Sequence, residues 1–113
     1  MQELEALDLM CTVAESVCPH VYVAGQHIPG PEDDPPAVEP DELIVLDLVT
    51  ATSLGGAGTT KRFQATVYAL SRTRSLQLAD LLRTALRGAG FGFIGQRRAL
   101  DPDKFGELLE YRR

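Results

Sequence analysis

The apolar residues of this chain follow a helical spacing in two segments and a strand-like pattern in the others. Residues 2–17 carry apolar side chains at steps of three and four, which predicts an amphipathic helix that stops before Pro19. Residues 21–24 are a short run with two valines and a tyrosine that predicts a strand ended by Gly25. The chain therefore begins with a helix and a short strand.

The second helical spacing covers about residues 74–88, where leucines and alanines recur on one stripe. Either Thr73 or Ser75 is expected to cap its N-terminus, because a hydroxyl oxygen can accept a hydrogen bond from a free amide there. Gly88 and Gly90 are expected to provide a left-handed exit at its C-terminus.

The two longest strand-like segments are Leu43–Leu54 and Lys61–Leu70. The second alternates strictly, which is typical of a half-buried antiparallel strand, and its expected buried face is Phe63, Ala65, Val67 and Ala69. Asp47 interrupts the first segment and is expected to point outward. Between the segments lie three glycines, which predict a hairpin connection: Gly55, Gly56 and Gly58.

The last part of the chain predicts another hairpin, with strands over residues 91–98 and 105–113 and a turn at 101–103. The order of elements is therefore helix, strand, strand, strand, helix, strand, strand. This order predicts a single α+β domain over residues 1–113, a two-layer sandwich with a mainly antiparallel sheet and two helices on one face. Strands near the ends of this order are candidates for open sheet edges, which can pair with another chain.

An acidic, proline-rich loop is predicted at about residues 26–42. Five of its residues are prolines, a density that excludes a helix and disfavours a central strand. The loop has two interpretations. It can be a solvated connector, or it can be an arm that contacts a neighbouring subunit, because long loops in small domains are often functional.

Charge is unevenly distributed along the chain, whose formal net charge is −5. Acidic residues cluster in the middle, including Glu32, Asp33 and Asp34. Basic residues concentrate after residue 70: Arg72, Arg74, Arg83, Arg87, Arg97, Arg98, Arg112 and Arg113. This is ordinary solvated surface, or complementarity between like subunits, or a DNA contact, which the net acidity disfavours. No apolar run approaches the ~20 residues of a membrane span.

The sequence contains no catalytic, cofactor or metal motif, so neither an enzyme nor a cofactor is expected. The glycine-rich connection lacks the lysine of a phosphate-binding loop. Cys18, His20 and His27 fall short of the four ligands of a structural zinc site. Cys11 and Cys18 are expected to lie two turns apart on one helix, which is too far for a disulfide, and to be reduced, buried residues in a cytoplasmic setting.

Three segments resemble the tail-terminator, or tail-completion, proteins of long-tailed phages and phage-like particles. They are residues 43–52, the basic-start strand 61–69 with its Val-Tyr-Ala step, and the helix 75–86 with its alanine–aspartate–leucine step. A closing hairpin like residues 91–113 follows in that family. The resemblance covers roughly the last seventy residues, and the acidic loop departs from the family's shorter connection.

The resemblance implies a structural virion protein that closes into a ring, usually of six copies. Such a ring caps the tail tube, ends tube growth and meets the head connector at the head-proximal end of the tail, after assembly in the host cytoplasm. Its partners would be further copies, the tube protein and the connector, without a membrane, and with DNA at most passing through the lumen. Candidate assembly contacts are Arg72, Arg74, Arg97, Arg98, Glu32, Asp33, Asp34, Gly55, Gly56 and Gly58. The alternatives are a head–tail joining (neck) protein and a small ligand-binding α+β regulatory domain.

Overall fold

The computed structural model describes residues 3–53 and 59–113, which form two helices and one five-stranded sheet. The strand order across the sheet is β1-β2-β3-β5-β4. All neighbouring strands are antiparallel except β1 and β2, which are parallel. The elements are α1 (Glu3–Glu15), β1 (Val21–Val23), β2 (Leu43–Ser53), β3 (Thr59–Ala69), α2 (Arg72–Gly88), β4 (Gly92–Ala99) and β5 (Phe105–Arg112).

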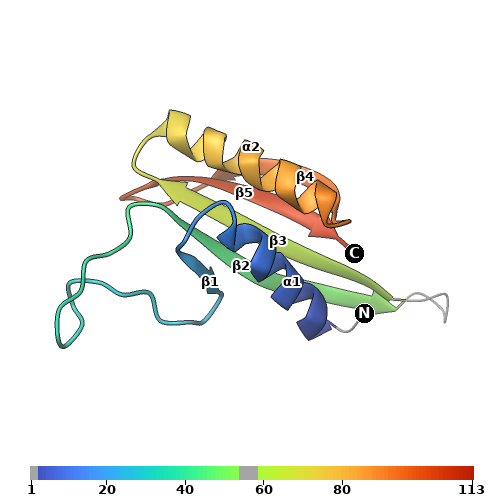
Figure 1. The fold of residues 1–113 in the computed structure, drawn as a ribbon, viewed down its shortest axis with the longest axis horizontal. Coiled ribbons are helices and arrows are strands. Elements are labelled where there is room, and N and C mark those ends of the chain that lie inside the picture. Colours follow the sequence, from blue (N-terminus) through green and yellow to red (C-terminus); the bar gives the residue numbers. More distant parts are fainter. Residues whose placement is uncertain (1–2, 54–58) are drawn as a thin grey trace.

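Both helices lie on the same face of the sheet (Figure 1). Helix α1 packs over β1 and β2, and α2 packs over β3, β4 and β5. The α+β two-layer sandwich with a mainly antiparallel sheet is thus confirmed. The opposite sheet face carries the alternate residues of β3, and Gln64, Thr66 and Tyr68 are half-exposed on it. That face is left open by the described part of the chain.

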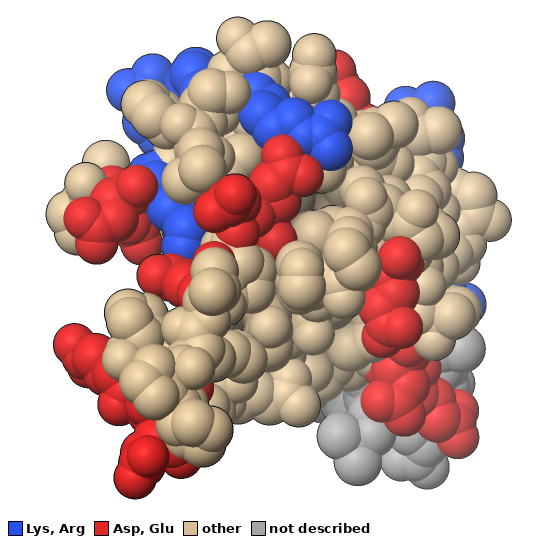
Figure 2. Space-filling model, turned by 60° about the vertical axis from the view of Figure 1, so that its left-hand side comes forward, with Lys and Arg blue, Asp and Glu red and all other residues tan. Residues whose placement is uncertain are grey.

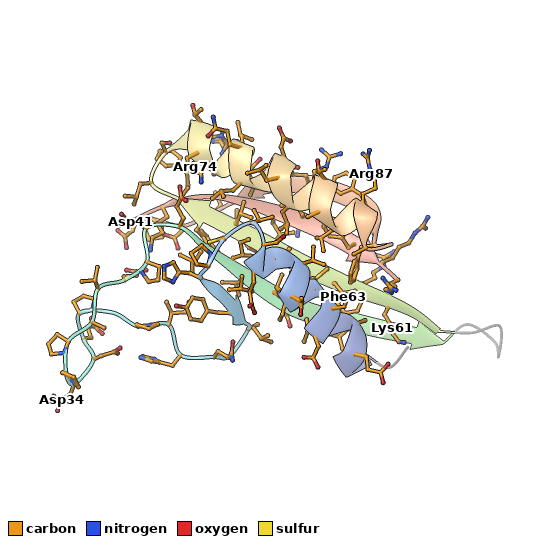
Figure 3. The ribbon with its side chains drawn as sticks, in the orientation of Figure 1. Asp34, Asp41, Lys61, Phe63, Arg74 and Arg87 are labelled. Carbon is orange, nitrogen blue, oxygen red and sulfur yellow. The ribbon has the colours of Figure 1, made fainter. Side chains whose placement is uncertain are left out.

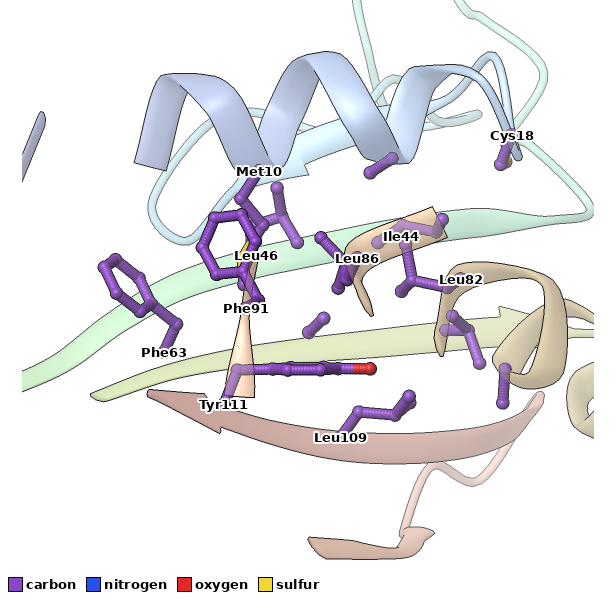
Figure 4. Close-up of a cluster of buried hydrophobic side chains, with 14 of the residues drawn as sticks. Met10, Cys18, Ile44, Leu46, Phe63, Leu82, Leu86, Phe91, Leu109 and Tyr111 are labelled. Carbon is purple, nitrogen blue, oxygen red and sulfur yellow. The ribbon is translucent and has the colours of Figure 1, made fainter. Parts of the chain in front are cut away.

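The core fills the space between the helices and the sheet (Figure 4). The expected inner face of β3 is fully buried, and helix α1 adds Met10 while α2 adds Leu82 and Leu86. Three aromatic rings meet edge to face at one end of this core: the Phe91 centroid lies 6.0 Å from that of Phe63 and 6.5 Å from that of Tyr111. These contacts tie the last hairpin to β3.

Helix α2 begins earlier than its sequence pattern predicts. Its N-cap is Ser71, whose Oγ accepts a hydrogen bond from the Arg74 amide at 3.2 Å, so the prediction of Thr73 or Ser75 was wrong. Ser75 is buried, and its hydroxyl donates to the Arg72 carbonyl. The capping site moves because Ser71 is still extended, with φ −138° and ψ 155°, the conformation that an N-cap needs.

Two further local expectations also need correction. Only Gly90 adopts the left-handed conformation after α2, with φ of +87°, whereas Gly88 is still helical. Cys18 lies beyond the end of α1 and is buried, while Cys11 is only half-buried. The helix stops at Glu15 because the following backbone forms turns toward Pro19. The two cysteines therefore have different surroundings, although both are free thiols.

The sheet ends in two edges that differ in kind. On one side β4 has no further neighbour among the described strands. On the other side β1 covers only Ile44–Leu46, so the second half of β2 extends past β1 and has no described strand on that side. Because β2 and β3 have eleven residues each, this half of their hairpin projects from the body of the domain (Figure 1).

Candidate assembly surface

The first open edge, called the β4 edge below, consists of β4 with the neighbouring side of α2. Arg83 from α2 lies over the ring of Phe93, with 4.0 Å between its Cζ and the ring centroid. Arg87 lies one helical turn further along the same side of α2. Phe93 and Ile94 are 41% and 40% exposed at this edge. The β4 edge therefore combines unpaired backbone, apolar surface and positive charge.

The second open edge, called the α1 edge below, consists of α1, β1 and the uncovered half of β2. The side of α1 that faces away from the core carries Glu5, Asp8 and Glu15, all exposed. No lysine or arginine occurs anywhere in α1. On β2, Asp47 is exposed as predicted. The charges of α1 are therefore all acidic, whereas the α2 side of the β4 edge carries Arg83 and Arg87 together with the exposed Asp80.

Arg74 and Arg72, two predicted assembly contacts at the start of α2, already have partners within the chain. Arg74 makes a two-point ion pair with Glu42, from Nε to Oε2 at 2.5 Å and from Nη2 to Oε1 at 3.1 Å. These bonds raise the pKa of the Arg74 guanidinium. Arg72 Nη1 lies 3.6 Å from the buried Glu107 carboxylate. Neither guanidinium is free to bind a second copy without giving up an internal contact.

The two predicted contacts on β4 differ from each other. Arg97 lies on the open sheet face, where its Nη1 is 2.6 Å from Glu110 Oε1. Arg98 is exposed and lines a shallow hollow of about 290 Å³ beside the turn between β4 and β5. Within the described residues, Arg98 makes no ion pair. Of the four predicted arginines, Arg98 is therefore the one whose charge is uncompensated there.

The acidic loop is irregular, as predicted, and its carboxylates are partly engaged. Asp33 pairs with His27 at 2.8 Å and accepts a hydrogen bond from the Gly30 amide, and the His27 contact is the main reason why the pKa of Asp33 is lowered. Glu39 is paired with Lys104 of the β4–β5 turn. Glu32 and Asp34 are exposed, and Asp34 lies at the far tip of the loop (Figure 3). The predicted contacts Gly55, Gly56 and Gly58 lie outside the described residues.

Sequence reasoning did not select the charges that stand out at the two edges. Glu5, Asp8 and Glu15 were not chosen as contacts. Arg83 and Arg87 were noted as basic but were not chosen as contacts. A usable signal was present, because α1 has acidic residues on its polar face and no basic residue among them. In Figure 2 the Lys and Arg side chains gather mainly in the upper half of the view, where some of them touch acidic side chains, and the lower half carries further acidic side chains.

A hollow of about 510 Å³ lies between the end of α1 and the start of α2. Its lining includes Cys18, His20 and the Arg74–Glu42 pair. Cys18 Sγ lies 3.7 Å and 3.6 Å from the carbonyl oxygens of His20 and Glu42, and burial raises the pKa of its thiol. A raised pKa makes a thiol a poor nucleophile. Among the described residues, no three His, Cys, Asp or Glu side chains are grouped to hold a metal ion.

The helices were also compared with membrane spans, and the chain with known proteins. None of the described helices is long and apolar enough to cross a lipid bilayer. A scan against models of known protein families gives no match to this chain, and a search of characterised proteins gives no match either. What the chain does must therefore be argued from its own residues and surfaces.

Proposed function

We propose that this chain is a structural protein of a phage or phage-like tail that closes into a ring, caps the tail tube and ends its growth. The sequence resemblance suggests this role. The observation that carries it is the pair of open edges at opposite ends of one sheet, one acidic and one basic. Two unlike, complementary edges on one molecule favour head-to-tail association, and such association forms a ring when the rotation closes.

The strand directions are suited to this arrangement. Strand β4 runs antiparallel to β5, β5 antiparallel to β3, and β3 antiparallel to β2, so β4 and β2 run in opposite directions. In a ring whose axis lies roughly along the strands, every copy of β2 keeps the same direction. Strand β4 of one copy would then meet β2 of the next copy in antiparallel orientation, which is the more stable pairing. The sheets would form one continuous band.

Such a band would place the helices on one side of the ring wall and the open sheet face on the other. The second half of β2 and the beginning of β3 extend along the strand direction beyond the helical layer (Figure 1). They would therefore project from one end of the ring. A projecting hairpin is suited to contact a stacked ring of tube protein.

The test is to determine the size and shape of the purified protein with and without tail tubes. Sedimentation and electron microscopy are expected to show rings with a central hole, and tubes mixed with the protein are expected to carry one extra ring at one end and to stop growing. A protein that stays monomeric at high concentration and leaves tube length unchanged would refute the proposal. Rings that bind the head connector but ignore tubes would indicate a neck protein instead.

A small ligand-binding regulatory domain is the second candidate, and the hollow beside Cys18 favours it, because about 510 Å³ is within the size range of ligand sites. This candidate predicts a discrete dimer and an increase in melting temperature with a small polar ligand. The ring proposal predicts neither. Thermal shifts measured over a panel of small carboxylates and amines, alongside sedimentation, separate the two.

A further inference from the structure

We propose that neighbouring copies recognise each other through opposite charges on their helical layers. The acidic side of α1 in one copy would lie against Arg83 and Arg87 on the β4 edge of the next copy. This inference rests on the ring arrangement proposed above, and it names the surface that each copy presents. It differs from the sequence-based hypothesis, in which the acidic loop supplies the carboxylates.

The acidic side of this contact lacks a partner inside the molecule. Glu5, Asp8 and Glu15 are exposed, and within the described residues none of them forms an ion pair. The carboxylates of Asp8 and Glu15 are close enough to Cys11 to contribute to its raised pKa, after burial as the main cause. An uncompensated acidic surface on a helix without basic residues favours a basic partner.

The basic side of the contact likewise has no ion pair within the described residues, although the exposed Asp80 lies one turn before Arg83 on the same side of α2. Arg83 stacks on Phe93 and Arg87 is exposed, and neither forms an ion pair with any described carboxylate. Both are close enough to Tyr111 to favour its charged form. Arg87 stands at the C-terminal end of α2, at the opposite end of the helix from Arg74 (Figure 3). Leu76, 40% exposed, adds apolar surface on the same side of α2.

The acidic side of α1 and the arginines of α2 both belong to the helical layer of the domain. Both helices cover the same face of the sheet, with α1 near the β1–β2 side and α2 near the β4 side. If β4 of one copy lies beside β2 of the next, the second copy's α1 is placed beside the first copy's α2. The acidic and basic helices are then neighbours across the boundary. The same pairing of sheet edges thus aligns the charges.

The acidic loop is the weaker candidate for this role. Three of its carboxylates, those of Asp33, Glu39 and Glu42, are already paired with His27, Lys104 and Arg74 of the same chain. Breaking these pairs would offset much of what new pairs contribute. The carboxylates of α1 require no such exchange. Glu32 and Asp34 of the loop are also unpaired among the described residues, but Asp34 lies at the far tip of an irregular loop, whereas α1 is a helix packed over the sheet. A second copy of the chain compensates the charge of both surfaces at once. DNA would compensate only the charge of the arginines and would be repelled by α1.

Charge reversal tests this contact. One variant carries Arg83→Glu with Arg87→Glu, and a second carries Asp8→Lys with Glu15→Lys. At 0.1 M salt, each variant alone is expected to lose at least tenfold in ring affinity by sedimentation. An equal mixture of the two, or one chain with all four changes, is expected to recover rings, because acidic and basic edges again alternate.

The matched control for the arginine variant is Arg62→Glu with Arg112→Glu, a cross-strand pair of β3 and β5 that makes the same change in net charge on strands that form neither edge. It is expected to assemble as the wild type does. Circular dichroism and urea unfolding of every variant separate lost assembly from lost folding.

The outcomes distinguish the inference from the function on which it rests. A wild type that forms no ring overturns both. Normal rings from both single-edge variants overturn the charge contact alone. Normal rings from the arginine variant with lost binding to a labelled DNA duplex would assign Arg83 and Arg87 to DNA instead, and would also overturn it.

Discussion

Arg74 at the start of α2 binds Glu42 at the end of the acidic loop through two parallel contacts of 2.5 and 3.1 Å. The pair joins the first turn of α2 to the residue that directly precedes β2. Both residues line the hollow of about 510 Å³ that Cys18 also lines. The pair therefore holds the loop end, the helix start and the end of α1 in one place.

Replacing Arg74 with alanine should loosen this junction without unfolding the domain. The pair is partly exposed, and such pairs contribute little to global stability, so the urea midpoint should change little. Amide exchange at residues 41–43 should instead become faster by roughly threefold or more. In the wild type, local opening of this segment must break the ion pair, whereas in the variant there is no pair to break. Arg74→Lys, which keeps the charge but cannot form both contacts, should give an intermediate rate. Unchanged exchange in both variants would contradict this role.

Removing the Glu107 carboxylate should destabilise the domain more strongly. Glu107 is buried, and its Oε2, Arg72 Nη1 and Gln96 Oε1 are buried atoms without a hydrogen-bond partner among the described residues. Glu107→Ala would also leave the Gln96 amide without its acceptor. We expect a loss of about 2–3 kcal/mol in urea unfolding, less than for a fully buried pair because Arg72 can turn toward water. A double change to Glu107→Met with Arg72→Met should recover much of this loss.

Gly106 should resist substitution because of a close contact with a ring. A Cβ at this position would lie 2.9 Å from Tyr68 Cε1 and 3.0 Å from Ala99 Cβ. Gly106→Ala should therefore cost about 1–3 kcal/mol through overpacking. Gly95, on the partner strand, is the control, because a Cβ there has nothing within 4 Å. Gly95→Ala should stay within about 0.5 kcal/mol of the wild type, and equal effects would contradict the packing argument.

Tyr111 should make stability depend on pH in alkaline solution. Burial raises its pKa from 10.0 to about 12, although Arg83 and Arg87 act in the opposite direction. Above pH 10 the unfolded chain loses this proton while the folded chain keeps it, so stability falls as pH rises toward 12. The loss should reach about 2–3 kcal/mol. In Tyr111→Phe this part of the pH dependence should disappear, and its stability at pH 7 should change by less than about 1 kcal/mol, because the buried hydroxyl has no partner among the described residues.

The two cysteines should react with thiol reagents at different rates. Cys11 is half-buried and Cys18 is buried, so native protein should be labelled first at Cys11 and at Cys18 only on unfolding. Burial is the main cause of the raised pKa of both thiols, so native labelling of Cys11 should accelerate as pH rises. Mass spectrometry of each labelled peptide measures both rates. Faster labelling of Cys18 than of Cys11 would contradict the described packing.

The elements were predictable where the residue pattern was strong. Strand β3 alternates strictly, and its apolar residues are buried as the pattern requires. The start of α2 was harder to predict, because Ser71, Thr73 and Ser75 can all act as caps. The choice of Ser71 depends on where β3 ends and the chain turns, which is decided by the packing of the two elements. Cys18 was assigned to the helix because no residue before Pro19 signals that the helix ends at Glu15.

The candidate surface was less predictable than the fold. The sequence shows that arginines are frequent after residue 70, but it does not show that Arg74 and Arg72 lie next to Glu42 and Glu107. These partners are 32 and 35 positions away along the chain, and only the packing of α2 on the sheet brings them together. Because of these pairs, two of the four arginines predicted as assembly contacts are already engaged within the chain. Of the four predicted arginines, only Arg98 is left without an ion pair among the described residues.

By itself, the sequence determined the two helices, the long hairpin and the α+β class, because periodicity and glycine or proline positions act over a few residues. Only the tertiary structure decided the strand order β1-β2-β3-β5-β4 and therefore which edges are open. Strand order depends on pairing between residues distant in sequence, which local patterns do not encode. The same is true of the charges, because a residue's partner depends on the element packed against it. The acidic and basic edges became visible once the sheet had placed α1 and β4 at opposite ends.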